Sequence, residues 1–216
     1  MNRFDMYPHL EDCMTMTCRE LMFHLGEIHR HKTSYCGRGV LKFPTDWLVM
    51  AEILEDTRPP LIVEIGSFDG GFALWMAHTT EALGLDCSII GIDIKERPSS
   101  VKHPRIEWVI GDATSPEVLA KVTDVAGGRK GMVIEDSDHK YATTKRLLDL
   151  YENFVAPNCY LVVEDTVVEY LAIPPIPGPL RAAQEFVQAR DGAWVTDRSR
   201  EKYIVTCNPS GYLLRL

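Results

Sequence analysis

The chain has 216 residues, of which 45% are hydrophobic and 25% charged, and its formal net charge is −8. The composition is that of an ordinary soluble globular protein, and the length suits one sizeable hydrophobic core. The acidic charge argues against nucleic acid as a partner, because binding a phosphate backbone needs a basic face. No apolar run approaches the roughly 18–20 residues that span a bilayer, and the first residues lack the pattern of a secretion signal. We therefore expect a cytoplasmic protein that binds neither nucleic acid nor membrane.

The N-terminal part of the chain is predicted to be helical. Apolar residues recur at helical spacing over residues 14–31. After a break rich in glycine, Thr45 or Asp46 is placed to cap a second helix. We assign residues 1–56 to a small helical extension that serves as a cap or in oligomerisation, and residues 57–216 to the main domain.

The main domain alternates strands and helices. Short apolar runs rich in β-branched residues predict strands over residues 61–66, 88–94, 106–111, 131–136 and 160–165. Helices are predicted over residues 70–83, 96–104 (short), 115–126, 139–154 and near 180–190. Residues 193–197 and 202–207 are predicted to form a closing hairpin. The pattern indicates a doubly wound α/β domain with a mostly parallel sheet and an antiparallel C-terminal hairpin.

Three successive strand ends carry residues suited to a nucleoside. The first strand ends in "VEIGSFDGG", where Gly66 and Gly70 allow a tight turn and close backbone approach before a helix. Asp93 and Asp112 end the next two strands, where they can reach ribose hydroxyls and an adenine edge. Each residue alone also has a structural interpretation, as a steric glycine or a helix cap. Together, at the ligand-binding edge of an open α/β sheet, they favour an adenosine-type cofactor.

The last two predicted parallel strands end in acidic residues. "MVIEDSDHKY" places Asp136, Asp138 and His139 after one strand, and "LVVEDT" places Glu164 and Asp165 at the end of the other. Crowded carboxylates cost free energy unless a cation or a proton offsets their charge. The alternative is a solvated surface patch, which the apolar strands before both groups disfavour. The pattern therefore indicates a site for a divalent cation.

With these strand ends in view, the chain resembles the family named for cephalosporin hydroxylase and rhamnosyl O-methyltransferase, from about residue 36 to the C-terminus. The likeness rests on several ordered segments: "GVLKFPTDW", "VEIGSFDGGFALWMA", "GIDI", "HPRIEWVIGDA", "DSDHKY", "YLVVEDT", "GPLRAAQEF" and "NPSGYLLR". The resemblance implies a Rossmann-like class I methyltransferase fold that uses S-adenosylmethionine. It also implies a divalent metal, usually Mg²⁺, beside that cofactor.

The resemblance also implies roles for the acidic residues. The metal ligands of the family fall on Asp138, Glu164 and Asp165, whereas related methyltransferases use the acid at the strand end itself, which is Asp136. Both aspartates therefore stay candidates. His139 falls where related sugar methyltransferases place a general base, with Asp138 as a further catalytic candidate.

Cofactor and substrate contacts follow from the same motifs. We assign the cofactor to Glu64, Gly66, Ser67, Gly70, Gly71, Asp93, Asp112 and Asp136. One departure is Phe72, because the family often has a small residue, usually Ser, after the Gly-Gly pair. Lys42 is a candidate substrate contact, with an exposed lysine as the alternative. Tyr170 and Ile176, beside a Pro-rich loop, are further candidates for the acceptor pocket.

The function expected from these features is S-adenosylmethionine- and Mg²⁺-dependent O-methylation of a small natural product, sugar-bearing or another specialised metabolite. The alternatives are an oxygenase, as the family's older name suggests, a nicotinamide-dependent oxidoreductase, and a non-catalytic accessory protein. The sequence lacks the G-x-G-x-x-G of dinucleotide enzymes, which disfavours the oxidoreductase. We expect a homo-oligomer.

Overall fold

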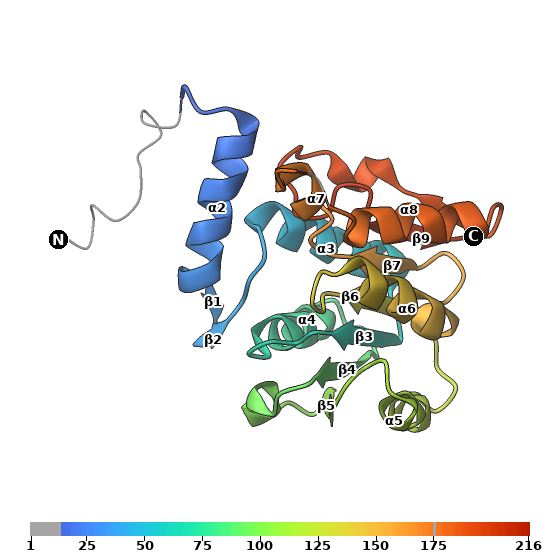
Figure 1. The fold of residues 1–216 in the computed structure, drawn as a ribbon. Helices are drawn as coiled ribbons and strands as arrows, with labels where there is room; N and C mark the ends of the chain where they lie inside the picture. The colour runs from blue at the N-terminus through green and yellow to red at the C-terminus, as the bar shows by residue number, and fades with distance from the viewer. Residues whose placement is uncertain (1–13, 175) are drawn as a thin grey trace.

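The computed structural model describes residues 14–174 and 176–216, and it has one central sheet flanked by helices (Figure 1). Seven strands lie in the order β5-β4-β3-β6-β7-β9-β8. Their bounds are β3 Leu61–Ile65, β4 Ser88–Asp93, β5 Ile106–Ile110, β6 Met132–Glu135, β7 Tyr160–Val163, β8 Trp194–Thr196 and β9 Tyr212–Arg215. The pairs from β5 to β7 are parallel, and β9 is antiparallel to both β7 and β8. The predicted fold class is confirmed.

The helices after β3, β5 and β6, and the one near residues 180–190, were predicted from the sequence, whereas the short helix after β7 was not. They are α4 Gly71–Ala82, α5 Pro116–Ala126, α6 Tyr141–Tyr151, α7 Val168–Leu171 and α8 Pro179–Ala189, with 3₁₀ turns η1 Arg97–Ser100, η2 Glu152–Phe154 and η3 Arg198–Glu201. All residues of β3, β6 and β7 are buried, because helices cover both faces of the parallel part of the sheet. The strand order reverses beside β3, so the carboxyl ends of β3 and β6 open a crevice for ligands.

The predicted strand over residues 202–207 is wrong. This segment consists of turns and bends, and Ile204 within it is 82% exposed. The antiparallel partner of β8 is β9 instead, where Tyr212 and Leu213 are buried against β7. Both segments are rich in apolar and aromatic residues, but only the later one pairs with β7 and β8.

The predicted cap of the second helix is also wrong. Helix α3, Pro44–Thr57, begins with proline in its first turn, and its N-cap residue Phe43 makes no side-chain capping bond. Thr45 and Asp46 lie inside the helix and use their side chains elsewhere. Thr45 donates to the backbone of Val205, and Asp46 accepts from the backbone N–H of Cys207 at 2.9 Å. Both side chains therefore form hydrogen bonds to a distant loop and do not cap the helix.

The N-terminal helix α2, Cys18–Lys32, stands beside the sheet domain (Figure 1) and begins with a capping box of Thr17 and Glu20. A short hairpin of β1 Ser34–Tyr35 and β2 Arg38–Gly39 follows, which the sequence did not predict. None of the helices in the described part of the chain combines the length and apolar character needed to cross a membrane.

Candidate active site

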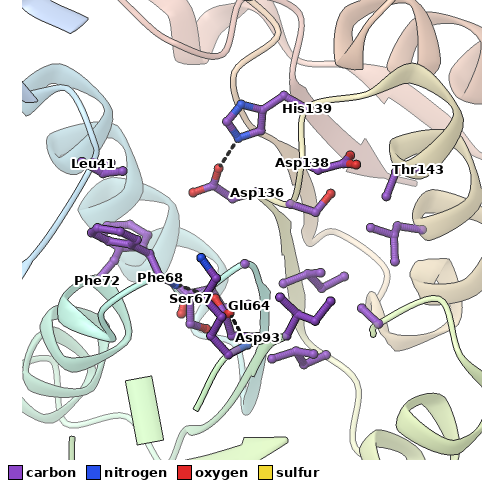
Figure 2. A pocket seen from close by; sticks show the side chains of 18 of the residues that line it. Leu41, Glu64, Ser67, Phe68, Phe72, Asp93, Asp136, Asp138, His139 and Thr143 are labelled. Carbon is purple, nitrogen blue, oxygen red and sulfur yellow. Dashed lines mark hydrogen bonds and ion pairs between the residues drawn. The ribbon is translucent and has the colours of Figure 1, made fainter. Parts of the chain in front are cut away.

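A cavity of about 560 Å³ lies at the carboxyl ends of the parallel strands, a volume suited to a small-molecule ligand. Most of the predicted site residues line it: Lys42, Glu64, Gly66, Ser67, Asp93, Asp112, Asp136, Asp138, His139 and Asp165. Figure 2 shows several of these side chains arranged around one space. The other five predicted site residues do not line the cavity: Gly70, Gly71, Glu164, Tyr170 and Ile176.

The turn after β3 needs glycine at Gly66. Its φ is +92°, and a Cβ there would lie 1.8 Å from the backbone oxygen of Asp136. The glycine turn is therefore pressed against the end of β6, which brings it next to the acidic residues that follow β6. Gly71 has a different role, since a Cβ there would lie 2.6 Å from the backbone oxygen of Gly39. Close approach of the β1–β2 hairpin explains this glycine.

Asp93 and Asp112 lie where the sequence predicted, at the ends of β4 and β5. Asp93 accepts from the backbone N–H groups of Phe68 and Lys95, both at 2.8 Å. Asp112 accepts from the N–H and hydroxyl of Thr114, and these bonds lower its pKa. Asp93 has one further lone pair on each oxygen, and Asp112 has its second oxygen, so each carboxylate can still accept a hydrogen bond from a ligand.

Asp69 organises the glycine turn after β3, a role that the sequence did not predict. Its carboxylate accepts from the backbone N–H of Gly39 at 2.7 Å and pairs with Arg38 and Arg97, both at 2.9 Å. Asp69 thus ties the β1–β2 hairpin to the glycine turn. Its position inside "SFDGG" was the available signal, but no local rule predicts its partners.

The strand ends of β6 and β7 converge on His139. Its Nε2 atom lies 3.2 Å from a carboxylate oxygen of Asp136 and 3.2 Å from one of Asp165. Ligand atoms of these three residues all lie within 4.8 Å of one another, and Figure 2 shows the contact between His139 and Asp136. The three residues form the group that we call the metal-site triad.

Asp138 lies outside the metal-site triad. Its carboxylate accepts from Lys140 Nζ at 2.7 Å and from the backbone N–H of Lys140. Figure 2 shows it pointing toward Thr143, away from the carboxylate of Asp136. Of the two aspartates that the sequence left open, the geometry therefore favours Asp136 as a ligand.

His139 has an unusual backbone and a perturbed imidazole. Its φ is +56°, in the left-handed region that residues other than glycine rarely adopt. Burial favours the neutral ring, but the hydrogen bond to Asp136 and the charge of Asp165 outweigh burial and raise the pKa of His139 to about 9. The imidazole thus acts as a counter-ion between two carboxylates.

Lys42 is a second buried counter-ion. Its side chain is 5% exposed, and Nζ donates to Asp136 at 2.7 Å and to Glu164. Burial disfavours the charge, but Asp136 and Glu164 outweigh burial and raise the pKa of Lys42 well above its ordinary value. The alternative of an exposed surface lysine is therefore wrong.

The residues present fit a divalent cation. Asp136, Glu164 and Asp165, which we call the carboxylate cluster, have carboxylate oxygens, the type of ligand that Mg²⁺ prefers. One oxygen of Glu164, Oε1, is buried without a hydrogen-bond partner among the described residues. A buried, unpaired carboxylate oxygen is costly, and a bound cation would satisfy it.

Phe72, the departure from the family pattern, packs inward. It is buried and stacks on Trp75, with ring centroids 5.1 Å apart and planes 12° apart. Its ring also lies 4.5 Å from Lys42 Nζ, in the geometry of a cation–π contact. Tyr170 and Ile176, in contrast, are exposed and lie off the cavity wall.

The chain is similar to known proteins over most of its length. The family described as rhamnosyl O-methyltransferase/CmcI matches residues 28–216. The chain belongs to this family. The rhamnosyl O-methyltransferase of Mycobacterium tuberculosis is 26% identical to this family member over 201 residues, which cover 89% of this chain and 82% of that protein. The predicted family and enzyme class, an S-adenosylmethionine-dependent O-methyltransferase, are confirmed.

Solved structures share the fold of this family member. The CmcI structure with Mg and SAM is 22% identical, with a TM-score of 0.65, and the match covers 85% of this chain and 76% of that one. The O-methyltransferase TomG from Streptomyces achromogenes, in complex with SAM, is 17% identical, with a TM-score of 0.56 and 90% coverage of both chains.

Proposed function

We propose that this family member transfers the methyl group of S-adenosylmethionine to a hydroxyl of a small natural product, a sugar-bearing compound or another specialised metabolite, with Mg²⁺ in the site. The observation that carries the proposal is the convergence of Asp136, Asp165 and His139 on the wall of the cavity that also contains the glycine turn. The name of the curated relatives, rhamnosyl O-methyltransferase, supports a sugar hydroxyl as the acceptor.

The donor is assigned to the end of the cavity formed by β3, β4 and β5. Asp93 suits the ribose hydroxyls, and Asp112 suits an adenine edge. Glu64 is buried, and its Oε2 atom has no hydrogen-bond partner within the described part of the chain. Burial raises the pKa of Glu64 to about 7, so a cationic group of the donor's methionine part is the partner that would favour its ionised form.

The carboxylate cluster of Asp136, Glu164 and Asp165 would hold the metal. Mg²⁺ held there would lower the pKa of an acceptor hydroxyl and help to orient it. The chain's own residues contribute the placement: the metal-site triad and the glycine turn line one cavity, so an acceptor hydroxyl on this wall faces the donor. Because the methyl group of the donor is already activated, positioning of this kind provides most of the rate enhancement.

His139 is assigned as the general base. The acceptor oxygen forms a bond to the methyl carbon while the bond from carbon to sulfur breaks, and the hydroxyl proton passes to Nε2 of His139. S-adenosylhomocysteine leaves. His139 can accept this proton once the charges of Asp136 and Asp165 are shared with a divalent cation, because those charges raise its pKa.

Methyl transfer with a defined acceptor panel tests the proposal. The full chain is incubated with S-adenosylmethionine and rhamnosides or other compounds with vicinal hydroxyls, with Mg²⁺ or with EDTA, and the products are analysed by mass spectrometry. We expect addition of one methyl group to a hydroxyl, and its loss in EDTA. Asp93→Ala is expected to weaken S-adenosylhomocysteine binding in calorimetry, whereas Asp86→Ala, at an exposed position, leaves it unchanged. Equal turnover in Mg²⁺ and EDTA would contradict the metal's role.

The site favours no second function. An oxygenase with non-haem iron uses two histidines and a carboxylate. Across residues 14–174 and 176–216, the group that can hold a metal contains a single histidine, His139.

We also propose that the N-terminal extension over residues 1–56 takes part in self-association. Within α2, Met22 packs against Phe43 and Val167, while the neighbouring Phe23 is half-exposed. A second copy of the chain is the partner that we propose for this surface. Light scattering tests it: a dimer or larger assembly is expected, with dissociation in Phe23→Ser. A monomer at all concentrations would contradict the proposal.

A further inference from the structure

Lys42 lies in a pocket closed on three sides. It follows the β1–β2 hairpin, and its Nζ contacts Asp136 from the end of β6 and Glu164 from the end of β7. The ring of Phe72, in the first turn of α4, lies 4.5 Å from Nζ on another side. Phe72 is itself fixed by stacking on Trp75. The ammonium group is thus held by three elements of the sheet domain.

The contacts of Lys42 divide the carboxylate oxygens in a specific way. Lys42 uses Oδ2 of Asp136 and Oε2 of Glu164. The other oxygen of Asp136 faces His139 at 3.2 Å, in the metal-site triad. The other oxygen of Glu164, in a residue that is only 4% exposed, has no partner among the residues that the structure describes. Lys42 therefore fixes one oxygen of each carboxylate, while the second oxygen faces His139 in Asp136 and has no partner among the described residues in Glu164.

The charges of the site lead to the same conclusion. With His139 neutral, as its proposed role of base requires, Asp136, Glu164 and Asp165 carry three negative charges when ionised, and Lys42 carries one positive charge. A divalent cation would bring the sum to zero. Without Lys42, one negative charge would remain uncompensated in a site with little access to water, and an uncompensated buried charge is strongly unfavourable.

We propose that Lys42 is a positioning residue of the metal site: it fixes one oxygen of Asp136 and one of Glu164 so that the second oxygen of each faces the cation, and Phe72 holds Lys42 there. The inference rests on the proposed function, in which the carboxylate cluster binds Mg²⁺. It assigns to Lys42 a role other than contact with the substrate. It also gives a reason for the aromatic ring at position 72, where the family often has a small residue.

Metal titration of the full chain tests the inference, with Mn²⁺ and Mg²⁺ as probes in calorimetry. Loss of a group that orients metal ligands typically costs 10–100-fold in affinity, so we expect Lys42→Met to bind Mn²⁺ about 10–100-fold more weakly. Lys42→Arg retains the charge and is expected to recover part of the affinity. Lys145→Met is the matched control, because Lys145 is 49% exposed and pairs with Glu185 on the outer surface. This control removes the same charge and is expected to leave the affinity unchanged.

Binding of S-adenosylhomocysteine and thermal melting are measured on every variant, so that a loss of folding is recognised. If Lys42→Met does not fold, Phe72→Leu decides, because it retains an apolar side chain but removes the ring face from Lys42. A several-fold weaker Mn²⁺ affinity is then expected. A folded Lys42→Met that binds Mn²⁺ as tightly as the unaltered chain, or more tightly, would overturn the inference, as would unchanged affinity in Phe72→Leu. Absence of Mn²⁺ and Mg²⁺ binding in the unaltered chain would instead overturn the proposed function.

Discussion

The imidazole of His139, after β6, lies 3.2 Å from the carboxylate of Asp165, after β7. This contact joins the ends of two neighbouring strands, and the same nitrogen lies 3.2 Å from Asp136. Parallel strands present their carboxyl ends at one edge of a sheet, so motifs that are distant in the chain meet there. The chemistry proposed for the site depends on this meeting point.

Substitution of Asp136 and of Asp138 is expected to have different effects on metal binding. Asp136→Asn removes one charge from the metal-site triad, and we expect Mg²⁺ affinity to fall at least about 10-fold and methyl transfer to fall with it. Asp138→Asn is expected to retain both within a few-fold, since Asp138 pairs with Lys140 outside the triad. Calorimetry with Mg²⁺ and initial rates measure the two effects. The reverse order of sensitivity would identify Asp138 as the ligand.

His139→Gln is expected to lower kcat about 10²–10⁴-fold, the usual contribution of a general base. The amide can still form hydrogen bonds, so the affinity for S-adenosylhomocysteine is expected to remain. The methyl-transfer rate over pH 6–10 is the second measurement. The rate of the unaltered enzyme should rise with pH, and this rising limb should be absent in the variant. A variant that retains both kcat and this limb would exclude His139 as the base.

Asn208 is expected to contribute to stability and to Mg²⁺ binding, although it is distant in sequence from the acidic motifs. It is 1% exposed, and its side-chain oxygen accepts from the backbone N–H of Asp165 at 3.0 Å. Because Asp165 has a φ of +54°, this bond helps to hold a strained residue. Asn208→Ala should lower the free energy of unfolding by about 1–3 kcal/mol and weaken Mg²⁺ binding several-fold. Chemical denaturation and calorimetry measure these losses, and Asn153→Ala, at an exposed position, is the control.

Glu135 is expected to make stability depend on pH. Burial raises its pKa to about 7, above the ordinary 4.5. Between these values the folded protein holds a proton that the unfolded chain has lost, so the contribution of Glu135 to stability falls as pH rises from about 4.5 to 7. Glu135→Gln cannot ionise and should become more stable relative to the unaltered chain across this window, by about 1–3 kcal/mol. Denaturation at pH 5 and pH 8 measures the change.

The exposed substitution Glu107→Gln is the control for that experiment, and it should shift stability equally at both pH values. A difference between Glu135→Gln and the unaltered chain that does not vary with pH would contradict the assignment of the raised pKa to Glu135.

Gly66→Ala tests the close approach between the glycine turn after β3 and the end of β6. The added Cβ would meet the backbone oxygen of Asp136 at 1.8 Å, so we expect a loss of roughly 2–4 kcal/mol in stability, at the high end for single substitutions. Gly84→Ala is the matched control: Gly84 also has a positive φ, +63°, but its Cβ position has no atom within 4 Å. Strain alone should cost about 1–2 kcal/mol there. Equal melting temperatures for the two variants would contradict the steric argument.

Much of the fold could be predicted because its signals are local. The five apolar runs became β3 to β7, and the glycine turn lies at the predicted strand end. The errors occurred where two local patterns were equally plausible. Residues 202–207 form an apolar run that resembles a strand, yet it is residues 212–215 that pair with β8. Thr45 and Asp46 resemble helix caps, yet both bond to the loop before β9.

The candidate site shows the same division. The sequence by itself determined which strands end in acids and which turn needs glycine, since strand patterns and backbone sterics depend on neighbouring residues. Only the tertiary structure decided that Asp136 rather than Asp138 faces Asp165, that Lys42 is a buried counter-ion, and that Asp69 and Asn208 support the site. These choices depend on which side chains share a space of low polarity. Coulomb attraction and desolvation act there through space, and the order of residues along the chain does not encode them.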